Sequence, residues 1–414
     1  MAVGTQEISL QQREPTARES LLRPLVLFFR ALRRTPIGFI GFIGVVFYAL
    51  LISVGPLIVP FDSEVRLDQI AAPPGSRVQL LTRAADVDRY RTLDDLAGQT
   101  VGVVRETAGP DLVAPYEAAG TFAVDETRWR SGRGVPQAME DLVDGEIDAL
   151  IVFSESVRRY ITENRDAAQA AQFSGLAVSN EALGPPYIFG TDTQGRDIFS
   201  HIVNGGTILI VTAVLAGFLS TLIAVGLGAL AALTGGFIDR GLTAIANFVL
   251  TIPQFPLLVV LAALVQLNNF MLLALLIALL SWPVLMRAIR AQVLSLRERD
   301  YVEAAIALNL GRPHIILREI LPNMMSFVVI NFIFAVTSAM YQQVGLVFLG
   351  MAPINDYTWG VMLYFGRTRG TLFSADSAMM VLAPVVAIAL FQVSMVLFAR
   401  AVEEMFDPRL RTVS

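Results

Sequence analysis

The stretch from Gly206 to Thr234 reads GTILIVTAVLAGFLSTLIAVGLGALAALT and holds no charged side chain. A bilayer core about 30 Å thick needs about 20 apolar residues of helix, so this stretch is long enough to cross it. Further stretches meet the same requirement at residues 36 to 59, 243 to 266, 268 to 287, 324 to 350 and 378 to 400. The sequence therefore predicts an all-α polytopic membrane protein with six transmembrane helices.

The composition agrees with this class and excludes several kinds of chemistry. Of 414 residues, 54% are hydrophobic and 16% charged, which is too apolar for a soluble domain of this length. There is no Cys, and all 31 basic residues are Arg, so thiol chemistry, a Schiff-base lysine and the lysine of a phosphate-binding loop are excluded. Only His201 and His314 are present, far apart in the sequence. We therefore predict no catalytic residue and no metal site on this chain.

The distribution of charge predicts the orientation in the membrane. Residues 61 to 200 hold 23 acidic and 13 basic side chains, a net of −10, and the rest of the chain holds 13 and 18, a net of +5. Because loops rich in Arg stay in the cytoplasm, we expect both termini there and residues 61 to 200 outside. The arginines concerned lie before the first span and after the fourth, at Arg13, Arg18, Arg23, Arg30, Arg33, Arg34, Arg287, Arg290, Arg297, Arg299, Arg312 and Arg318.

The acidic segment after the first span is expected to fold by itself, over residues 70 to 180. Strand-length apolar runs at 78 to 81, 101 to 104 and 149 to 153 alternate with helix-like stretches at 92 to 98 and 135 to 143. Strands interleaved with helices are typical of an α/β fold. We therefore expect a small α/β domain inserted into the membrane bundle on its extracytoplasmic side.

Residues 299 to 323 carry a recognisable spacing. Glu303-Ala304-Ala305 is followed by Asn309, then Gly311, and then Leu321-Pro322. This pattern resembles the EAA loop of ABC importer permeases, in which E-A-A is followed at a fixed distance by I-x-L-P. An ordinary amphipathic helix beside the membrane is the alternative without that spacing. The resemblance implies a helix that docks on an ATPase, with small residues for close approach and the proline ending the segment before the next span.

This chain departs from the EAA pattern at one position, where the family usually has glycine and this sequence has Asn309. Asn is the residue other than glycine that best tolerates left-handed backbone angles. We therefore expect the turn after the docking helix to be kept.

A second motif precedes the span that starts near Ile202. Residues 189 to 197 read FGTDTQGRD and resemble the F-G-T-D-x-x-G-R-D sequence of the dipeptide/oligopeptide/nickel permease family. Its members here are Gly190, Thr191, Asp192, Gly195, Arg196 and Asp197. A run rich in Gly and Asp before a helix is also what a turn with an N-cap needs, so these side chains have a structural explanation beside a functional one.

Shorter matches extend the resemblance over the rest of the chain outside the insertion. They are Ala31 to Arg34, Pro56 to Asp62, Phe255-Pro256, Ser281 to Pro283, Phe348 to Gly350, Trp359-Gly360 and Asp407 to Arg411. All are similar to the second permease subunit of that family. The resemblance implies the type I permease fold of ABC importers and a role in taking up peptides or similarly sized solutes.

Within the spans, polar side chains are few and ionisable ones almost absent, so no proton relay or fixed ion site is indicated. Gln342 and Gln343 lie in an apolar run, and Gln254 stands between Pro253 and Pro256. These glutamines either line the translocation path or hydrogen-bond neighbouring helices. The two prolines indicate a local break in the helix that is suited to a gate.

The inserted domain carries a resemblance of its own. Residues 93 to 109 and 138 to 149 resemble one lobe of a periplasmic solute-binding protein, in which a loop such as Glu106 to Gly109 presents backbone N–H groups to a ligand carboxylate. One lobe lacks the opposing lobe that closes on a solute. Solute capture, a docking surface for a separate binding protein, and a regulatory or inert insertion therefore remain open.

The sequence thus predicts the following organisation: a cytoplasmic segment 1–35, a first transmembrane helix 36–60, an extracytoplasmic insertion 61–188, a five-helix core 189–400 with the EAA loop 299–323, and a cytoplasmic tail 401–414. The resemblance implies a bacterial inner-membrane subunit that pairs with a second permease, two ATPase subunits holding ATP and Mg, and an extracytoplasmic binding protein. No cofactor and no nucleic acid are expected on this chain. The rival functions are a membrane receptor that senses a ligand through the outer lobe and a membrane-embedded enzyme.

Overall fold

The computed structural model describes residues 35–406 apart from 64, 67–68, 105–106, 108, 126–133, 156, 158–170, 172, 266, 268, 355–356 and 372–376. Several predictions fall outside these residues. They concern most of the N-terminal segment with its arginines, the loop residue Glu106, and the tail after residue 406.

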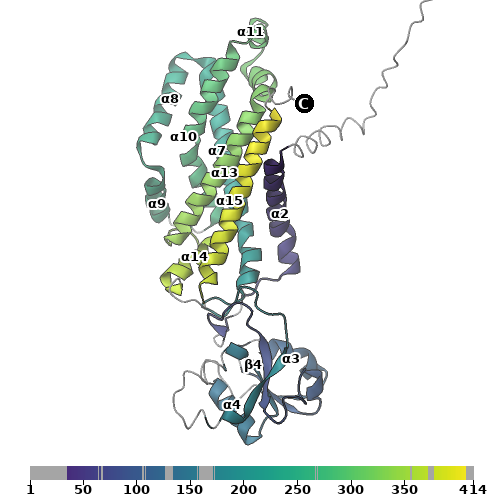
Figure 1. Cartoon of the computed structure of the whole chain (residues 1–414). Coiled ribbons are helices and arrows are strands. Elements are labelled where there is room, and N and C mark those ends of the chain that lie inside the picture. Colours follow the sequence, from purple (N-terminus) through teal and green to yellow (C-terminus); the bar gives the residue numbers. More distant parts are fainter. Residues whose placement is uncertain are drawn as a thin grey trace, which may run out of the picture.

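A helical bundle forms the larger part of the molecule, and a small domain lies at one end of it (Figure 1). The bundle is built from α2 (Pro36–Ile58), α7 (Ile198–Thr234), α8 (Gly236–Thr251), α9 (Gln254–Val265), α10 (Phe270–Arg297), α13 (Met325–Phe348), α14 (Trp359–Thr368) and α15 (Met379–Phe406). The short helix α11 (Asp300–Ala307) lies at the end of the bundle opposite the domain, and α2 runs beside α15.

Five helices of the described part are long and apolar enough to cross a membrane, and a sixth crossing results if the bent pair α8 and α9 is one span. Several boundaries differ from the prediction. The second span begins at Ile198 rather than 206, because Asp197 caps its first turn. The fourth helix continues to Arg297 rather than ending at 287, and the last continues to Phe406 rather than ending at 400. The count of six predicted spans therefore depends on how α8 and α9 are counted.

The predicted third span at residues 243 to 266 is not one straight helix. The axes of α8 and α9 meet at 84°, and Ile252 between them has an extended backbone. The following Pro253 disfavours helical angles at the residue before it. The break expected from the prolines is therefore present, and it divides this part of the chain into two shorter helices.

Pro322 does not end a segment, contrary to the prediction. It lies inside a helical run from Arg312 to Phe348, which comprises α12 (Arg312–His314), a wider turn over Ile315–Ile320, a tighter turn over Leu321–Met324, and α13. The proline stands in the first positions of the tighter turn. The change from a wider to a tighter turn accommodates Pro322 while the chain stays helical.

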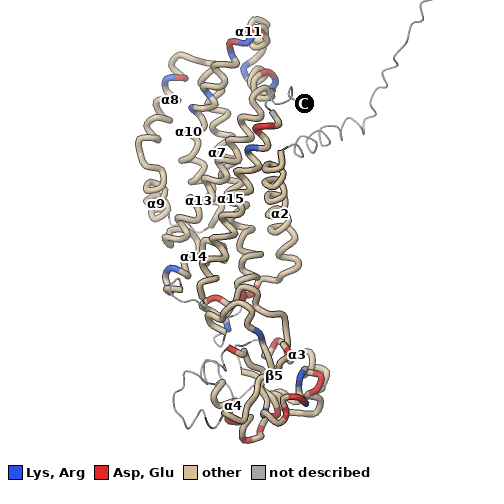
Figure 2. The backbone as a smooth tube through the Cα atoms, in the orientation of Figure 1, with Lys and Arg blue, Asp and Glu red and all other residues tan. Residues whose placement is uncertain are grey.

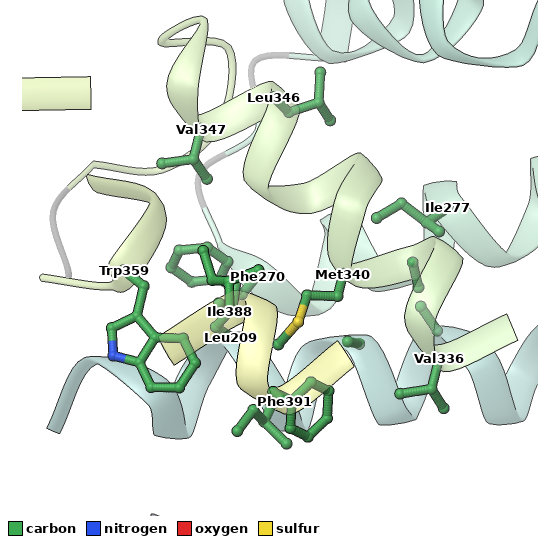
Figure 3. Packing of buried hydrophobic residues seen from close by; sticks show 14 of the residues in the cluster. Leu209, Phe270, Ile277, Val336, Met340, Leu346, Val347, Trp359, Ile388 and Phe391 are labelled. Carbon is green, nitrogen blue, oxygen red and sulfur yellow. The ribbon is translucent and has the colours of Figure 1, made fainter. Parts of the chain in front are cut away.

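The bundle is held by apolar packing at the centre of its length. Leu209 of α7, Phe270 and Ile277 of α10, Met340 of α13 and Phe391 of α15 belong to one buried cluster (Figure 3). Small residues let these helices approach closely, as is typical of membrane bundles.

Charged residues gather at the two ends of the bundle, and its middle is almost free of them (Figure 2). This distribution is what a bilayer core requires, because ionised side chains at its centre are costly. Acidic residues dominate the described part of the small domain, as the net charge of residues 61 to 200 predicts.

The small domain contains a five-stranded sheet in the order β3-β2-β4-β1-β5. Its strands are β1 (Val78–Arg83), β2 (Thr100–Gly102), β3 (Ala123–Asp125), β4 (Ala149–Phe153) and β5 (Leu176–Ala182). β2 pairs in parallel with β3 and β4, whereas β1 pairs antiparallel with β4 and β5. Three of the strands fall where strands were predicted.

Both faces of this sheet are covered. One face packs its buried residues with Leu96 and Val113, the latter from α3 (Gly109–Ala118). The other packs against Met139 and Leu142 of α4 (Gly134–Asp144). The central strand β4 is buried at all five positions, which explains its continuous apolar sequence. The predicted helix at 92 to 98 is reduced to a single tight turn over Asp94–Leu96.

Candidate functional site

The predicted coupling segment, residues 299–323, places its motif residues on two faces of α11. Val302 and Ala305 are buried against the bundle, together with Ile315 and Ile320. Glu303 and Ala304 face outward. The E-A-A triplet therefore contributes one residue to the core and leaves two on an open surface.

The turn after α11 has the backbone that the sequence leads us to expect. Asn309 has φ +51°, which is the left-handed conformation. The Leu310 N–H donates to the Ala305 carbonyl at 3.1 Å, and the Asn309 N–H donates to the Ile306 carbonyl at 2.9 Å. This pair of bonds is the Schellman arrangement that closes a helix C-terminus. Gly311 has φ −60° and instead precedes the next helix, so Asn309 takes the place of the usual glycine.

A groove of about 490 Å³ lies beside α11, between it and the end of α10. Its lining includes Leu294, Arg297, Glu303, Ile306 and Ala307. Ile306 is 45% exposed and contributes apolar surface to this groove. An apolar floor with charged residues of both signs at its edge has the composition of a protein interface.

Polar contacts join α10, the helix that precedes α11, to α7 and α8. Arg297 of α10 donates to the Ala232 carbonyl of α7 at 3.2 Å. Arg290 of α10 makes a two-bond ion pair with Asp239 of α8, with one N···O distance of 2.7 Å. These contacts join α10 to α7 and α8 near the end from which α11 follows.

At the opposite end of the bundle, the second motif forms a closed turn around Asp192. The Asp192 carboxylate is fully buried and accepts the N–H groups of Gln194 at 2.7 Å and Arg196 at 2.9 Å. The Tyr357 hydroxyl donates to it at 2.6 Å, and the Arg196 guanidinium stacks on the Tyr357 ring at 4.3 Å. Burial, followed by the charge of Asp192, raises the pKa of the Tyr357 hydroxyl far above its ordinary value. Asp192 therefore holds the motif together from inside.

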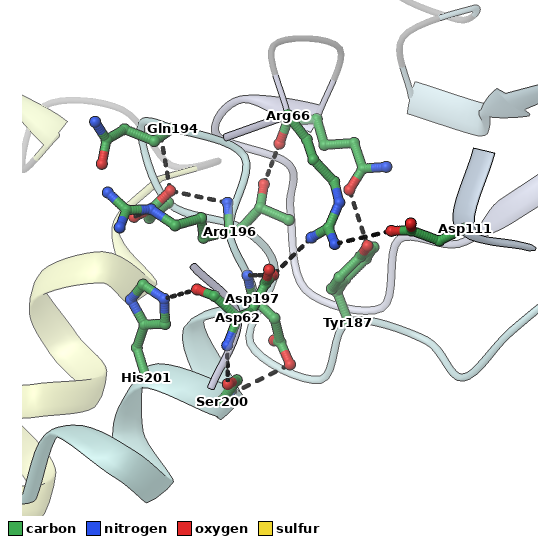
Figure 4. A network of polar contacts seen from close by, with 12 residues as sticks. Asp62, Arg66, Asp111, Tyr187, Gln194, Arg196, Asp197, Ser200 and His201 are labelled. Atoms are coloured by element: carbon green, nitrogen blue, oxygen red, sulfur yellow. Dashed lines mark hydrogen bonds and ion pairs between the residues drawn. The ribbon is translucent and has the colours of Figure 1, made fainter. Parts of the chain in front are cut away.

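Asp197 completes the motif as the N-cap of α7. Its carboxylate accepts the N–H of Phe199 at 3.0 Å and that of Ser200 at 3.3 Å. Its own N–H donates to Asp62 at 3.0 Å, so the end of α2 is joined to the start of α7 (Figure 4). Burial raises the pKa of the Asp197 carboxyl above its ordinary value, although the two N–H groups oppose this shift.

Arg66 joins the motif to the small domain. Its guanidinium pairs with Asp62 at 2.7 Å and lies 3.8 Å from Asp111 of α3, as Figure 4 shows. The Arg66 N–H also donates to the Gln194 carbonyl at 2.8 Å. Gly195 has φ +79°, and a β-carbon there would overlap the Arg66 carbonyl oxygen. The glycine is therefore required both by its backbone angles and by the close approach of the second chain segment.

We call this arrangement the outer junction and define it as Asp62, Arg66 and residues 189–201 with Tyr357. The two chain segments that lead to the domain run side by side, because Ala71 N–H donates to the Asp192 carbonyl at 2.9 Å and Thr191 N–H to the Ala72 carbonyl at 3.1 Å. Within the described part of the chain, no group of three or more His, Asp or Glu side chains is arranged to hold a metal ion.

Gln254 and Gln342 form a third polar cluster together with Ser281. Gln254 at the start of α9 donates to Ser281 of α10 at 2.6 Å and to Gln342 of α13 at 3.1 Å. These bonds favour helix bonding for Gln254 and Gln342. Gln343 is fully buried, and neither of its polar side-chain atoms has a partner in the part of the chain that the structure describes.

The loop expected to present N–H groups in the small domain is described only at Thr107 and Gly109. The Thr107 hydroxyl accepts the Gly109 N–H at 3.1 Å and donates to the Val104 carbonyl at 2.7 Å. The first N–H of α3 is therefore used by a neighbouring side chain.

The sequence identified the motif residues but missed the residues that surround them. Asp62 was noted only as part of an end-of-span match, and Arg66 and Tyr357 carried no signal of their own. Tyr357 lies 165 positions from Asp192, so only the fold brings the two together. An acidic residue in a buried motif predicts that a hydrogen-bonding partner exists, but it does not predict where that partner lies in the chain.

Residues 224–412 match the family model described as the inner membrane component of binding-protein-dependent transport systems. This match indicates a membrane permease component over that part of the chain. The predicted resemblance to the dipeptide/oligopeptide/nickel permeases is confirmed, because similar proteins are named as peptide permeases and as OppC.

The similar curated proteins are named as peptide permeases. A putative peptide permease protein of Brucella suis biovar 1 is 37% identical over 198 residues, which are 48% of this chain and 65% of that protein. The oligopeptide transport system permease protein OppC of Mycobacterium tuberculosis is 28% identical over 239 residues, covering 52% of this chain and 82% of that protein. This chain thus spans slightly less than two thirds of the Brucella relative's length.

Among solved structures, an inward-facing methionine ABC transporter, MetNI, aligns with 49% of this chain and 96% of its own chain, at 18% identity and a TM-score of 0.39.

Proposed function

We propose that this chain is one of two membrane subunits of an ATP-driven importer for peptides or similar small solutes. The match of residues 224–412 to binding-protein-dependent transport components supports this role, as do relatives named as peptide permeases. The single observation that carries it is the coupling segment, in which α11 lies at the end of the bundle with Glu303 and Ile306 on an open groove. A helix presented in this way is suited to docking on another protein.

In this proposal, two ATPase subunits bind at α11 and carry ATP and Mg, and this chain performs no covalent chemistry. Closure of the ATPases pulls on α11 and the end of α10. The contacts of Arg297 with α7 and of Arg290 with α8 pass this displacement into the bundle. The bend at Ile252 lets α8 move without carrying all of α9 with it.

The orientation follows from the same assignment. The α11 end of the bundle faces the cytoplasm of a bacterium, both termini are cytoplasmic, and the α/β domain stands outside the inner membrane. The pair α8 and α9 makes one bent crossing, which gives six spans. A second permease completes the pore, and a separate binding protein delivers the solute, with the α/β domain as its docking surface.

The test is affinity purification of the tagged full chain from its native membrane, for the wild type and for Glu303→Arg. We expect a second permease and two ATPases with the wild type and loss of the ATPases from the variant, because a reversed charge in the docking groove repels its partner. Glu404→Arg is the matched control, since Glu404 is also an exposed acidic residue near the end of α15 and does not line that groove.

The alternative outcomes separate the rival functions. If the wild type purifies with signalling proteins and no ATPase, the importer assignment is wrong and the receptor function replaces it. If both variants lose the ATPases equally, the groove beside α11 is not the docking site.

A further inference from the structure

The helix α8 exposes a line of neutral polar side chains. Thr243, Asn247 and Thr251 follow one another at intervals of four residues, so they lie along one side of the helix. Asn247 and Thr251 are exposed, and Thr243 is partly exposed. We call these three residues the polar line. It lies at the edge of the bundle away from α2, where α8 and α9 are found (Figure 1).

The polar line is distinct from the two other sides of α8. Successive residues of an α-helix are about 100° apart, so Ala246, Asn247 and Phe248 point to three different sides. Ala246 is the one fully buried residue of α8 and packs in the cluster that α7 and α10 share. On the third side, Phe248 is 69% and Ile245 is 54% exposed, which is an apolar surface suited to lipid. The polar line therefore needs surroundings of another kind.

Asn247 is the member of the polar line whose hydrogen-bonding groups are unused. The Thr251 hydroxyl donates to the Phe248 carbonyl at 2.6 Å, and the Thr243 hydroxyl donates to Asp239 at 3.4 Å. The Asn247 carboxamide makes no hydrogen bond with another described residue, although it can donate two and accept two. Lipid tails offer such a group no partner. Water or another polar molecule must therefore reach Asn247.

The break between α8 and α9 indicates the same surroundings independently. Thr251, Ile252 and Pro253 are all exposed, and Ile252 has an extended backbone. The ends of two helices leave N–H and C=O groups without intrahelical partners. Non-helical backbone at the depth of a membrane is tolerated where it is buried in protein or lines a water-filled space. Because these three residues are not buried in this subunit, lipid does not cover this side of the bent pair.

Polar residues continue the line at both of its ends. Towards α11 stand Arg240 and the ion pair of Asp239 with Arg290, in the charged end of the bundle (Figure 2). Beyond the break stands Gln254, which bonds Ser281. Contacts between two membrane helices are made mainly by small residues with isolated polar pairs. A polar line that runs lengthwise from the charged end to the break is instead what a water-filled path requires.

We infer that the polar line is the wall that this subunit contributes to the translocation path on the α11 side of the break, and this inference rests on the proposed import function. Its carboxamide and hydroxyl groups both donate and accept hydrogen bonds, so they suit any polar solute in transit. The line itself carries no charge. Peptides with cationic and with anionic side chains therefore pass it equally well.

The absence of Cys from this chain allows a direct test of water access. Asn247→Cys and Ile245→Cys are made singly in the full complex in nanodiscs and are labelled with a charged, membrane-impermeant methanethiosulfonate. Ile245→Cys is the matched control, because it lies two residues away and is also exposed on this subunit. We expect Asn247→Cys to react several-fold faster, because the thiolate and the charged reagent both need water.

The second measurement is the charge selectivity of transport. Uptake of alanyl-lysyl-alanine and of alanyl-glutamyl-alanine into proteoliposomes is compared for the wild type, Asn247→Asp, Asn247→Arg and Asn247→Ser. We expect Asn247→Asp to raise the ratio of the lysine to the glutamate peptide several-fold and Asn247→Arg to lower it, because a fixed charge in the path attracts the opposite charge. Asn247→Ser should leave the ratio unchanged. A ratio does not depend on how much of each variant folds.

Three results would overturn the inference while the import function stands, provided that the complex transports trialanine. Equal, slow labelling at both positions means that the second permease covers the polar line. Equal, fast labelling means that water reaches the apolar side of α8 as well, so the polar line has no surroundings of its own. An unchanged ratio in both charged variants means that the solute does not pass Asn247. If the complex contains no ATPase and transports no peptide, the import function and the inference fail together.

Discussion

The outer junction and the coupling segment both contain motifs that resemble those of one permease family. The polar side chains of the first motif are buried or partly buried and hydrogen-bonded within the chain, whereas those of the second are exposed. Asp192 and Asp197 point into the junction and are occupied by the chain's own N–H groups and by Tyr357. Glu303 and Ile306 point away from the bundle onto an open groove. The difference indicates that the first motif builds the subunit, whereas the second is available to a partner. Substitutions in the two regions should therefore separate stability from assembly.

The largest effect is expected for Gly195→Ala. The added carbon overlaps the Arg66 carbonyl oxygen and the residue has a positive φ, so we expect a loss of more than about 4 kcal/mol and little folded protein. Gly98→Ala is the matched control, because Gly98 has φ +76° but open space around it, and should lose about 1 kcal/mol. Thermal unfolding in detergent, followed by size-exclusion chromatography, measures both. Equal losses would show that the close approach at Gly195 does not matter.

Asp192→Ala is expected to lose about 3 to 5 kcal/mol, because it leaves the buried Arg196 guanidinium without its carboxylate. Asp192→Asn keeps an acceptor for the backbone N–H groups and should lose less. The same thermal measurement distinguishes the two. A loss of peptide transport at unchanged stability would contradict the structural role and assign this motif to solute contact.

Asp197 gives a smaller effect that depends on pH. Asp197→Ala removes the N-cap of α7 and should lose about 1 to 2 kcal/mol, whereas Asp197→Asn keeps a capping oxygen and should stay within about 1 kcal/mol of the wild type at neutral pH. The pKa of this carboxyl is raised by burial, so the folded protein binds its proton more tightly than the unfolded chain does.

It follows that the wild type gains stability relative to Asp197→Asn as the pH falls through the raised pKa, and that the gain is complete below the unfolded value. Melting curves of the two proteins at neutral and mildly acidic pH measure this difference. If the stability advantage of the wild type over Asp197→Asn shrinks on acidification, the two N–H groups rather than burial determine the pKa of the Asp197 carboxyl.

Asn309→Ala should lose about 1 kcal/mol, since alanine adopts left-handed backbone angles less readily, and Asn309→Gly should be neutral or slightly stabilising. Melting temperatures of the two variants test the turn. Their recovery of ATPase subunits in a pull-down shows whether the turn also matters for docking.

The smallest effect on stability is expected for Glu303→Arg, within about 0.5 kcal/mol of the wild type, because the side chain is exposed. The same variant should show the largest loss of partners. A large drop in its melting temperature would remove the contrast between the two regions, because Glu303 would then belong to the core of the subunit.

The sequence was sufficient wherever structure is determined locally. Apolar length located the long helices, and the left-handed turn at Asn309 follows from the chemistry of one residue and its neighbours. Strand-length runs coincide with β1, β2 and β4 for the same reason. The widened turn before Pro322 was missed, because a change of helical pitch leaves the apolar pattern almost unchanged.

Contacts between distant residues were beyond the reach of the sequence. The bond between Gln254 and Gln342 spans 88 positions, and that between Tyr357 and Asp192 spans 165. Each requires that two helices or loops be placed side by side, which depends on packing of the whole bundle.

The paired chain segments beneath the small domain have a mechanical consequence. Hydrogen bonds join Arg66, Ala71 and Ala72 to residues 191–194, so the two chain segments that lead to the domain are paired rather than independent. We expect paired segments to resist twisting more than single ones. Arg66 adds a contact to the domain through Asp111 of α3. We therefore expect the domain to turn with any tilt of α2 against α7, and its far edge to move further than its base.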